Sequence, residues 1–254
     1  MPAGKKPEHA VYIYGIVPSD VETTLDARGV GSPPAKVRTV ARGDIAALVS
    51  LVDTKKPLGR PEDLTAHEAL LDQTAAEAPV LPVRFGAVMT DEEAVVEELL
   101  SAHYEEFVTA LEELEGKAEF VVRGRYELDA VLREMLAADE EVVRLRDAIR
   151  DKPEDATRNE RMALGERIAN AIAARREVDT QTVVQALTDV GGTVNVREPT
   201  HDEDAAHVAC LIDLSAQHDL ESAVDKIARE WVDRVNVRLL GPLAPYDFVV
   251  KTEV

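Results

Sequence analysis

The segment Ala206-His-Val-Ala-Cys-Leu-Ile-Asp-Leu214 is almost continuously apolar, which is typical of a strand covered on both faces. Two other segments, Thr193-Val-Asn-Val-Arg-Glu198 and Arg234-Val-Asn-Val-Arg-Leu239, alternate strictly between apolar and polar residues, as edge strands do. A fourth, Phe120-Val-Val-Arg-Gly-Arg125, is intermediate. The strands that begin at Phe120 and Ala206, the first and third in chain order, are therefore expected at the centre of a sheet. The strands that begin at Thr193 and Arg234, the second and fourth, are expected at its edges.

Helical segments connect the strands. One long helix is predicted from about Asn159 to Asp189, and a second carries Leu220, Val224, Ile227 and Trp231 on one face. The resulting order is β-α-β-β-α-β, the split βαβ arrangement of ferredoxin-like folds. We therefore expect a modified ferredoxin-like domain over residues 117–254, with a helical insert at about 127–151 and a C-terminal tail at 241–254.

The first half of the chain predicts a separate α+β domain over residues 1–116. It opens with the strand Val11–Val17. A hairpin follows, in which Val37–Ala41 and Ile45–Val52 flank the turn Arg42-Gly43-Asp44. Pro61 begins a helix that ends before Pro79.

The end of this half combines a buried strand and a long amphipathic helix. Val80–Val88 is apolar on both faces except for Arg84, and Thr90-Asp-Glu-Glu93 has the pattern of a capping box. The helix behind it has one apolar stripe, formed by Val96, Leu100, Tyr104, Phe107, Leu111 and Leu114. Gly116 ends the helix, and the domain boundary is expected there.

Charge and composition limit the classes of partner. The formal net charge of −20 disfavours nucleic acid, whose phosphates would be repelled. No apolar run approaches the length of about 20 residues that a membrane-spanning helix needs. The start, Met1-Pro-Ala-Gly-Lys-Lys-Pro-Glu, lacks the apolar core of a signal peptide, so a cytoplasmic location is expected. The single cysteine, Cys210, lies in an apolar strand and is expected to pack as a small hydrophobic residue.

Catalytic signatures are missing from the sequence. No glycine-rich phosphate loop with a following Lys-Ser or Lys-Thr occurs, and no serine stands in a Gly-x-Ser-x-Gly context. The segment His201-Asp-Glu-Asp-Ala-Ala-His207 mixes metal-ligand types, but it spans a hairpin loop where acidic residues are ordinary. We therefore expect no enzyme activity, no cofactor and no metal site.

Arg84 stands alone in a strand otherwise suited to burial, Leu81-Pro-Val-Arg-Phe-Gly86. A buried cation needs a partner, so one interpretation is an internal ion pair with a carboxylate. The other is that Arg84, with Phe85, recognises a partner at a sheet end.

Alternation along the predicted sheet collects arginines on the face opposite the helices. This face would carry Arg123, Arg125, Arg197, Arg234 and Arg238. Guanidinium groups bind carboxylates bidentately, which makes the face a candidate partner site. The alternative is that acidic residues of the insert or of the first domain cover the face and pair with these arginines.

The C-terminal stretch carries two prolines and two aromatic rings. In Leu239-Leu-Gly-Pro-Leu-Ala-Pro-Tyr-Asp-Phe-Val249, Pro242 must either end the preceding strand or sit in an edge strand. Tyr246 and Phe248 are candidate anchors for a partner. The tail is too apolar to remain in water, so we expect it to pack back on the first domain.

This ending strongly resembles the close of the GvpF/GvpL family of gas vesicle accessory proteins. Leu81-Pro-Val-Arg-Phe-Gly-Ala-Val-Met-Thr90 and Tyr12-Ile-Tyr-Gly-Ile-Val17 resemble the same family, with a lean towards its GvpL branch. The resemblance implies a two-domain α+β fold with a modified ferredoxin-like second domain. It further implies a non-enzymatic role in gas vesicle assembly, in contact with the hydrophobic, GvpA-like shell subunit and other accessory proteins. A different class remains open, a regulatory protein that binds a small molecule on a ferredoxin-like scaffold.

Overall fold

A computed structural model of the chain describes residues 8–21 and 28–249. The chain forms two compact units. Unit 1 runs up to Phe120 and also includes Leu211–Ser215 and the segment that starts at Gly241, while unit 2 comprises Val121–Cys210 and Ala216–Leu240. The division of the sequence into folding domains at Gly116 stays a prediction.

Unit 1 contains an antiparallel sheet. Strands β2 (Arg38–Arg42), β3 (Ile45–Asp53), β1 (His9–Pro18) and β4 (Leu81–Pro82) follow one another in that order, and β5 (Val88–Met89) also pairs with β1. The expected hairpin is confirmed, because Arg42 pairs with Ile45 across the two residues Gly43 and Asp44. Gly43 has a φ of 61°, a conformation that glycine adopts without steric cost.

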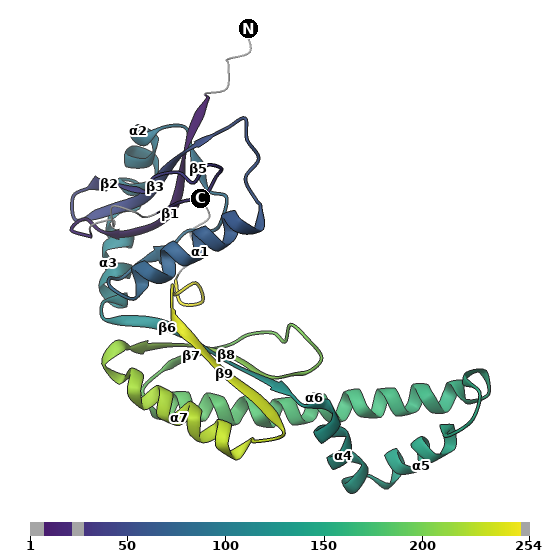
Figure 1. Ribbon diagram of the computed structural model, residues 1–254. Coiled ribbons are helices and arrows are strands. Elements are labelled where there is room, and N and C mark those ends of the chain that lie inside the picture. The colour runs from purple at the N-terminus through teal and green to yellow at the C-terminus, as the bar shows by residue number, and fades with distance from the viewer. Residues whose placement is uncertain (1–7, 22–27, 250–254) are drawn as a thin grey trace. The chain divides into compact units, whose positions relative to one another are not determined.

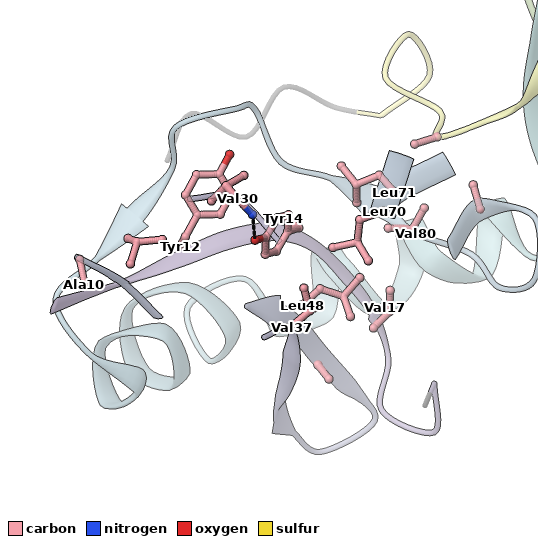
Figure 2. Packing of buried hydrophobic residues seen from close by; sticks show 14 residues of the cluster. Ala10, Tyr12, Tyr14, Val17, Val30, Val37, Leu48, Leu70, Leu71 and Val80 are labelled. Carbon is pink, nitrogen blue, oxygen red and sulfur yellow. Dashed lines mark hydrogen bonds between the residues drawn. The ribbon is translucent and has the colours of Figure 1, made fainter. Parts of the chain in front are cut away.

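Both faces of this sheet are covered, because β1 alternates between two cores. Tyr12, Tyr14 and Val17 face one cluster, which includes Leu70 and Leu71 of helix α1 (Pro61–Ala75) (Figure 2). Val11, Ile13 and Ile16 face the other cluster, built by the π-helix η1 (Val95–Leu100) and helix α3 (Tyr104–Leu114). A register shift between Ile13 and Gly15 keeps the alternation aligned with both cores.

The long helix expected after residue 90 is divided. A short helix α2 (Glu92–Ala94) leads into η1, and Ser101–His103 form a turn before α3. The expected capping box at Thr90 is wrong, because Asp91 is the capping residue and its Oδ1 accepts a hydrogen bond from the Ala94 amide at 2.9 Å. The buried residues Leu100, Phe107, Leu111 and Leu114 confirm most of the predicted apolar stripe.

The predicted strand Val80–Val88 is likewise two short pieces, β4 and β5. Val83 and Ala87 are both hydrogen-bonded to β1, since the Val83 amide donates to Tyr14 O and the Ile13 amide donates to Ala87 O. Between them the chain turns outward through Gly86, which has a φ of 97°. Arg84 lies on this turn and is exposed, so the buried ion pair expected for it is wrong.

The second sheet has the order β7-β8-β6-β9, formed by β7 (Thr193–Val196), β8 (Asp204–Asp213), β6 (Lys117–Tyr126) and β9 (Val235–Leu243). The first and third strands of the split βαβ unit, β6 and β8, are central, and β7 and β9 are edges. The predicted ferredoxin-like strand order is confirmed. Strand β9 continues through Gly241-Pro242, which an edge strand tolerates because a proline there removes no ladder hydrogen bond.

Helices α6 (Arg158–Asp189) and α7 (Gln217–Glu230) lie on one face of this sheet (Figure 1). Within unit 2, the insert forms α4 (Leu128–Ala138) and α5 (Glu140–Ile149), which pack against α6. Two short 3₁₀ helices, η2 (Glu154–Thr157) and η3 (Leu214–Ala216), complete the set. In the part of the chain that the structure describes, none of the helices is long and apolar enough to cross a membrane.

Candidate partner-binding surfaces

Unit 2 contains a pocket of about 590 Å³ on the sheet face opposite the helices. Strand β6 contributes Arg123, Arg125 and Tyr126, and β9 contributes Asn236 and Arg238. Glu203 and the start of α4, Glu127–Asp129, complete the lining. We call this site the arginine pocket. Three of the predicted arginines therefore do share one face.

Asp204 neutralises part of the positive charge in this region. Its side chain is buried and accepts hydrogen bonds from the Thr200 hydroxyl at 2.9 Å and from the amides of Thr200 and His201 at 2.8 and 3.0 Å. Burial alone would raise the pKa of Asp204, but these hydrogen bonds and the charge of Arg123 lower it. Arg123 Nη2 and Arg125 Nε lie 3.8 and 3.9 Å from its carboxylate oxygens.

These distances show which carboxylate lies beside two of the arginines, a question that the sequence analysis left open. For Arg123 and Arg125, the compensating carboxylate is that of Asp204, the first residue of β8. Arg238 is exposed and forms no ion pair with any residue that the structure describes, so its guanidinium is available to a partner.

Arg234 does not belong to this face, so its predicted place there is wrong. Its Nη1 and Nη2 donate to Asp179 on α6 at 2.7 and 3.1 Å, and its guanidinium carbon lies 5.0 Å from the Trp231 ring centroid. The cause is local, because β9 begins only at Val235 and the preceding residue, Asp233, has a φ of 63°. The turn redirects the Arg234 side chain towards the helices. Arg197 also lies outside the pocket, directly after β7.

Asp179 is the buried centre of a polar cluster in unit 2. Besides Arg234, it accepts a hydrogen bond from the Tyr126 hydroxyl at 2.8 Å. Burial is the main cause that raises the pKa of Tyr126, and the hydrogen bond to Asp179 adds to it. The sequence contained one signal of this cluster, since Arg175, Arg176 and Asp179 interrupt the apolar stripe of the long helix.

The loop between β4 and β5 presents Arg84 and Phe85 in unit 1. Arg84 is exposed, whereas Phe85 is partly buried and lies edge-on to His67, with ring centroids 5.6 Å apart. Val88 beside the loop is 50% exposed. This loop therefore offers one cation and one apolar side chain to a partner, while Phe85 is already held by the core of unit 1.

Residues 241–249 of the tail pack within unit 1 as expected, and the tail's residues 250–254 lie outside the described residues. The Ala244 amide donates to Asp72 Oδ1 of α1 at 2.9 Å, and the Asp247 amide donates to Glu119 Oε2 at 3.1 Å. Tyr246 and Phe248 are both partly buried, and burial raises the pKa of the Tyr246 hydroxyl. Tyr246 is thus engaged in the fold of unit 1 and not presented as a free anchor.

His67 joins the tail to the β4–β5 loop, a role that its sequence context did not indicate. Its side chain is buried; Nε2 lies 3.1 Å from both Val83 O and the Tyr246 hydroxyl, and Nδ1 lies 3.0 Å from the Tyr12 hydroxyl. Burial lowers the pKa of His67, and the bond to Val83 only partly offsets this. A neutral ring with its proton on Nε2 satisfies these contacts.

No group of three or more metal-ligating side chains is found within residues 8–21 and 28–249. In the His201–His207 segment, Asp204 Oδ2 accepts hydrogen bonds from Thr200 and His201, whereas Asp204 Oδ1 is buried without a hydrogen bond from any described residue and lies 3.9 Å from Arg125 Nε.

The sequence is similar to gas vesicle proteins along almost its whole length. The profile of the family described as gas vesicle synthesis protein GvpL/GvpF matches residues 10–250. Gas vesicle protein F of Streptomyces sp. (strain CB03234) is 32% identical, with 94% of this chain and 99% of that protein covered. Gas vesicle protein L of the same strain is 28% identical over 93% and 91% of the two chains. The identity to protein F is thus higher than the identity to protein L. The lean towards the GvpL branch stays a prediction.

Solved structures agree with the sequence relatives. The crystal structure of the gas vesicle protein GvpF from Anabaena sp. PCC7120 has a TM-score of 0.77 and 25% identity, covering 94% of this chain and 97% of that one. GvpF from Microcystis aeruginosa has a TM-score of 0.74 and 23% identity, covering 94% and 98% of the two chains, and shares the fold. Both the two-sheet α+β fold and the sequence therefore lead to one conclusion: this chain belongs to the gas vesicle synthesis protein GvpL/GvpF family.

Proposed function

We propose that this protein is a non-enzymatic accessory protein of gas vesicle assembly, which binds the hydrophobic, GvpA-like shell subunit and other assembly proteins. The observation that carries the proposal is the extent of the family match, which spans residues 10–250 and therefore both units. We further propose that it acts in the cytoplasm, at forming gas vesicles.

The use of the buried polar groups supports a binding role rather than catalysis. His67, Asp179 and Asp204 are each held by hydrogen bonds from the protein itself. Catalysis needs a nucleophile or a general base that can reach a substrate, and these groups are directed into the fold instead.

The large negative charge of the chain suits a protein that binds a partner prone to aggregation. A shell subunit with exposed apolar surface needs a partner that remains dispersed. A formal net charge of −20 makes copies of the present protein repel one another. The arginine pocket gathers three of the chain's 29 lysine and arginine residues on one face. We propose that Arg125 and Arg238, with Arg123 behind them, orient a partner through its carboxylates.

The proposed contact residues also include Arg84 and Phe85 of the β4–β5 loop, and Phe248 of the tail. Arg234 and Tyr246, which the sequence also suggested, are assigned to the fold because Asp179 and His67 respectively engage their polar groups. Their replacement would disturb a unit and would not report on a partner directly.

The test is capture of the shell subunit by the tagged full-length protein after co-expression. The double variant Arg125→Glu, Arg238→Glu reverses the pocket. Arg144→Glu combined with Arg146→Glu is the control with the same change in charge, because these side chains are 73% and 44% exposed on α5. Circular dichroism establishes that each variant is folded. We expect the wild type and the control to capture the subunit and the double variant to lose at least about tenfold in affinity.

Failure of the folded wild-type protein to capture the shell subunit would refute this function. If the double variant Arg125→Glu, Arg238→Glu captures the subunit as well as the wild type does, the proposed function stands. The arginine pocket is then not part of the contact surface. A thermal shift of several degrees with a small carboxylate or phosphate compound would favour the alternative, a small-molecule-binding regulatory protein.

A further inference from the structure

Helices α6 and α7 leave an apolar groove between them, with a volume of about 720 Å³. Its apolar lining comes from α6 and α7 together: Val178, Ala186, Val190, Ala223 and Ile227. All lining residues belong to unit 2. We call this feature the α6–α7 groove.

Val178 is the unusual residue of the groove. Its side chain is 65% exposed, although the neighbouring Asp179 is buried against the rest of unit 2. The face of α6 that packs inward uses Val183 and Leu187, which are fully buried. The groove therefore lies on the other face of α6, where unit 2 itself leaves Val178 uncovered.

The shape of the groove suits a helix. Its residues on α6 and at the C-cap of that helix run from Glu177 to Val190. They recur at intervals of one, three and four, so they form one continuous face. At a rise of 1.5 Å per residue, this face is about 20 Å long, or roughly four helical turns. A third helix laid between two helices buries its apolar stripe there by ridges-into-grooves packing.

The rim of the groove selects the charge of that helix. Glu177, Asp189 and Glu230 stand against a single cation, Lys226. Asp189 accepts a hydrogen bond from Gln185 Nε2 at 2.7 Å, whereas Glu177 and Glu230 form no ion pair with any described residue. A helix flanked by lysine or arginine would complement this rim.

The acidic rim also argues against two other occupants. A second copy of this chain carries the same formal net charge of −20, which opposes close approach of two such surfaces. An anionic lipid surface would be repelled in the same way.

We propose that the α6–α7 groove binds an amphipathic helix of a partner protein, with an apolar stripe about four turns long and lysine or arginine at its flanks. The proposal gives the assembly role a defined second contact, separate from the arginine pocket. It rests on the proposed function only for the source of the helix, the shell subunit or another assembly protein.

The probes are two synthetic, fluorescently labelled helical peptides with the same Leu/Ala stripe, one flanked by lysine and the other by glutamate. Fluorescence anisotropy with the full-length protein measures their affinities. We expect the lysine peptide to bind at least about tenfold more tightly at low salt, and the difference to shrink as salt screens the rim.

Val178→Asp should weaken binding of the lysine peptide at least about tenfold, because it places a charge on the apolar lining of the groove. Met162→Asp is the matched control, since Met162 is 63% exposed on the same helix and does not line the groove. The double variant Glu177→Lys, Glu230→Lys should reverse the preference between the two peptides. Equal affinities for the two peptides, or equal effects of Val178→Asp and Met162→Asp, would overturn the proposal.

Shell-subunit capture by the same variants separates the two proposals. If Val178→Asp loses both peptide binding and capture of the shell subunit while Met162→Asp keeps both, the shell subunit is the source of the helix. Peptide binding by a wild-type protein that captures no shell subunit supports the groove and refutes the proposed function. Loss of peptide binding with retained capture also supports the groove and assigns its helix to another assembly protein.

Discussion

The imidazole Nε2 of His67 lies 3.1 Å from the hydroxyl of Tyr246, although 179 residues separate the two in the chain. The same nitrogen lies 3.1 Å from Val83 O in the loop that follows β4. The contact therefore joins two segments, Leu81–Thr90 and the tail, that resemble the family. It indicates that these residues share a role in the core of unit 1.

Tyr246→Phe should lower the free energy of unfolding of unit 1 by about 1 kcal/mol, because Val83 O still accepts a hydrogen bond from Nε2. His67→Ala should cost about 3 kcal/mol, since it leaves the Tyr12 hydroxyl and Val83 O without that partner. Hydrogen exchange of β1 and β3 peptides, read by mass spectrometry, measures both effects within unit 1. Equal costs for the two variants would contradict the assigned roles.

Unit 1 should lose stability as the pH falls from about 6.5 towards 5. Burial lowers the pKa of His67 in the folded state, so the unfolded chain, with a pKa near 6.5, takes up its proton first. The loss amounts to at most about 1.4 kcal/mol per pH unit and is absent above this window. Hydrogen exchange of unit 1 at several pH values tests this, with His67→Asn as the variant that should flatten the slope.

Arg234→Ala and Arg238→Ala should differ strongly in stability. Arg234 is 15% exposed and pairs with Asp179, which is 8% exposed, so its loss leaves a buried carboxylate and should cost about 3 kcal/mol. Arg238 is exposed, and its loss should cost less than about 0.5 kcal/mol. Trp231, the single tryptophan, reports on unit 2 by fluorescence during urea unfolding. A similar midpoint for both variants would show that the Asp179 pair contributes little.

Two glycines of unit 2 should respond to alanine in opposite directions. A Cβ on Gly165, within α6, would meet nothing within 4 Å, so Gly165→Ala should stabilise the helix by about 0.5 to 1 kcal/mol. A Cβ on Gly192 would lie 2.2 Å from Cys210 Sγ and 2.9 Å from Leu187 O. Gly192→Ala should therefore destabilise unit 2 by more than about 1 kcal/mol, again measured through Trp231.

The order of the second sheet could be predicted because burial leaves a direct record in the sequence. The near-continuous apolar run of β8 and the alternation of β7 and β9 distinguish central from edge strands without reference to any contact. The hairpin at Gly43 and the ends of α1 and α6 are equally local features, set by glycine and proline.

The errors arose where a strand pattern extended beyond the strand. Arg234 continues the alternation of β9 in the sequence, but the turn at Asp233 precedes the strand and sends its side chain to Asp179. Arg84 follows apolar residues, yet Gly86 and the hydrogen bonds of Val83 and Ala87 to β1 turn the loop outward. His67 could not be identified as a central residue, because each of its partners lies far along the chain.

The position of the tail in unit 1 has a consequence for synthesis on the ribosome. Ala244 and Tyr246 pack against a cluster that otherwise consists of residues from the first third of the chain. A nascent chain therefore cannot complete this core until Ala244 and Tyr246 have been synthesised and have left the exit tunnel. A product that stops at Leu240 would keep an open core and be a preferred substrate for proteases.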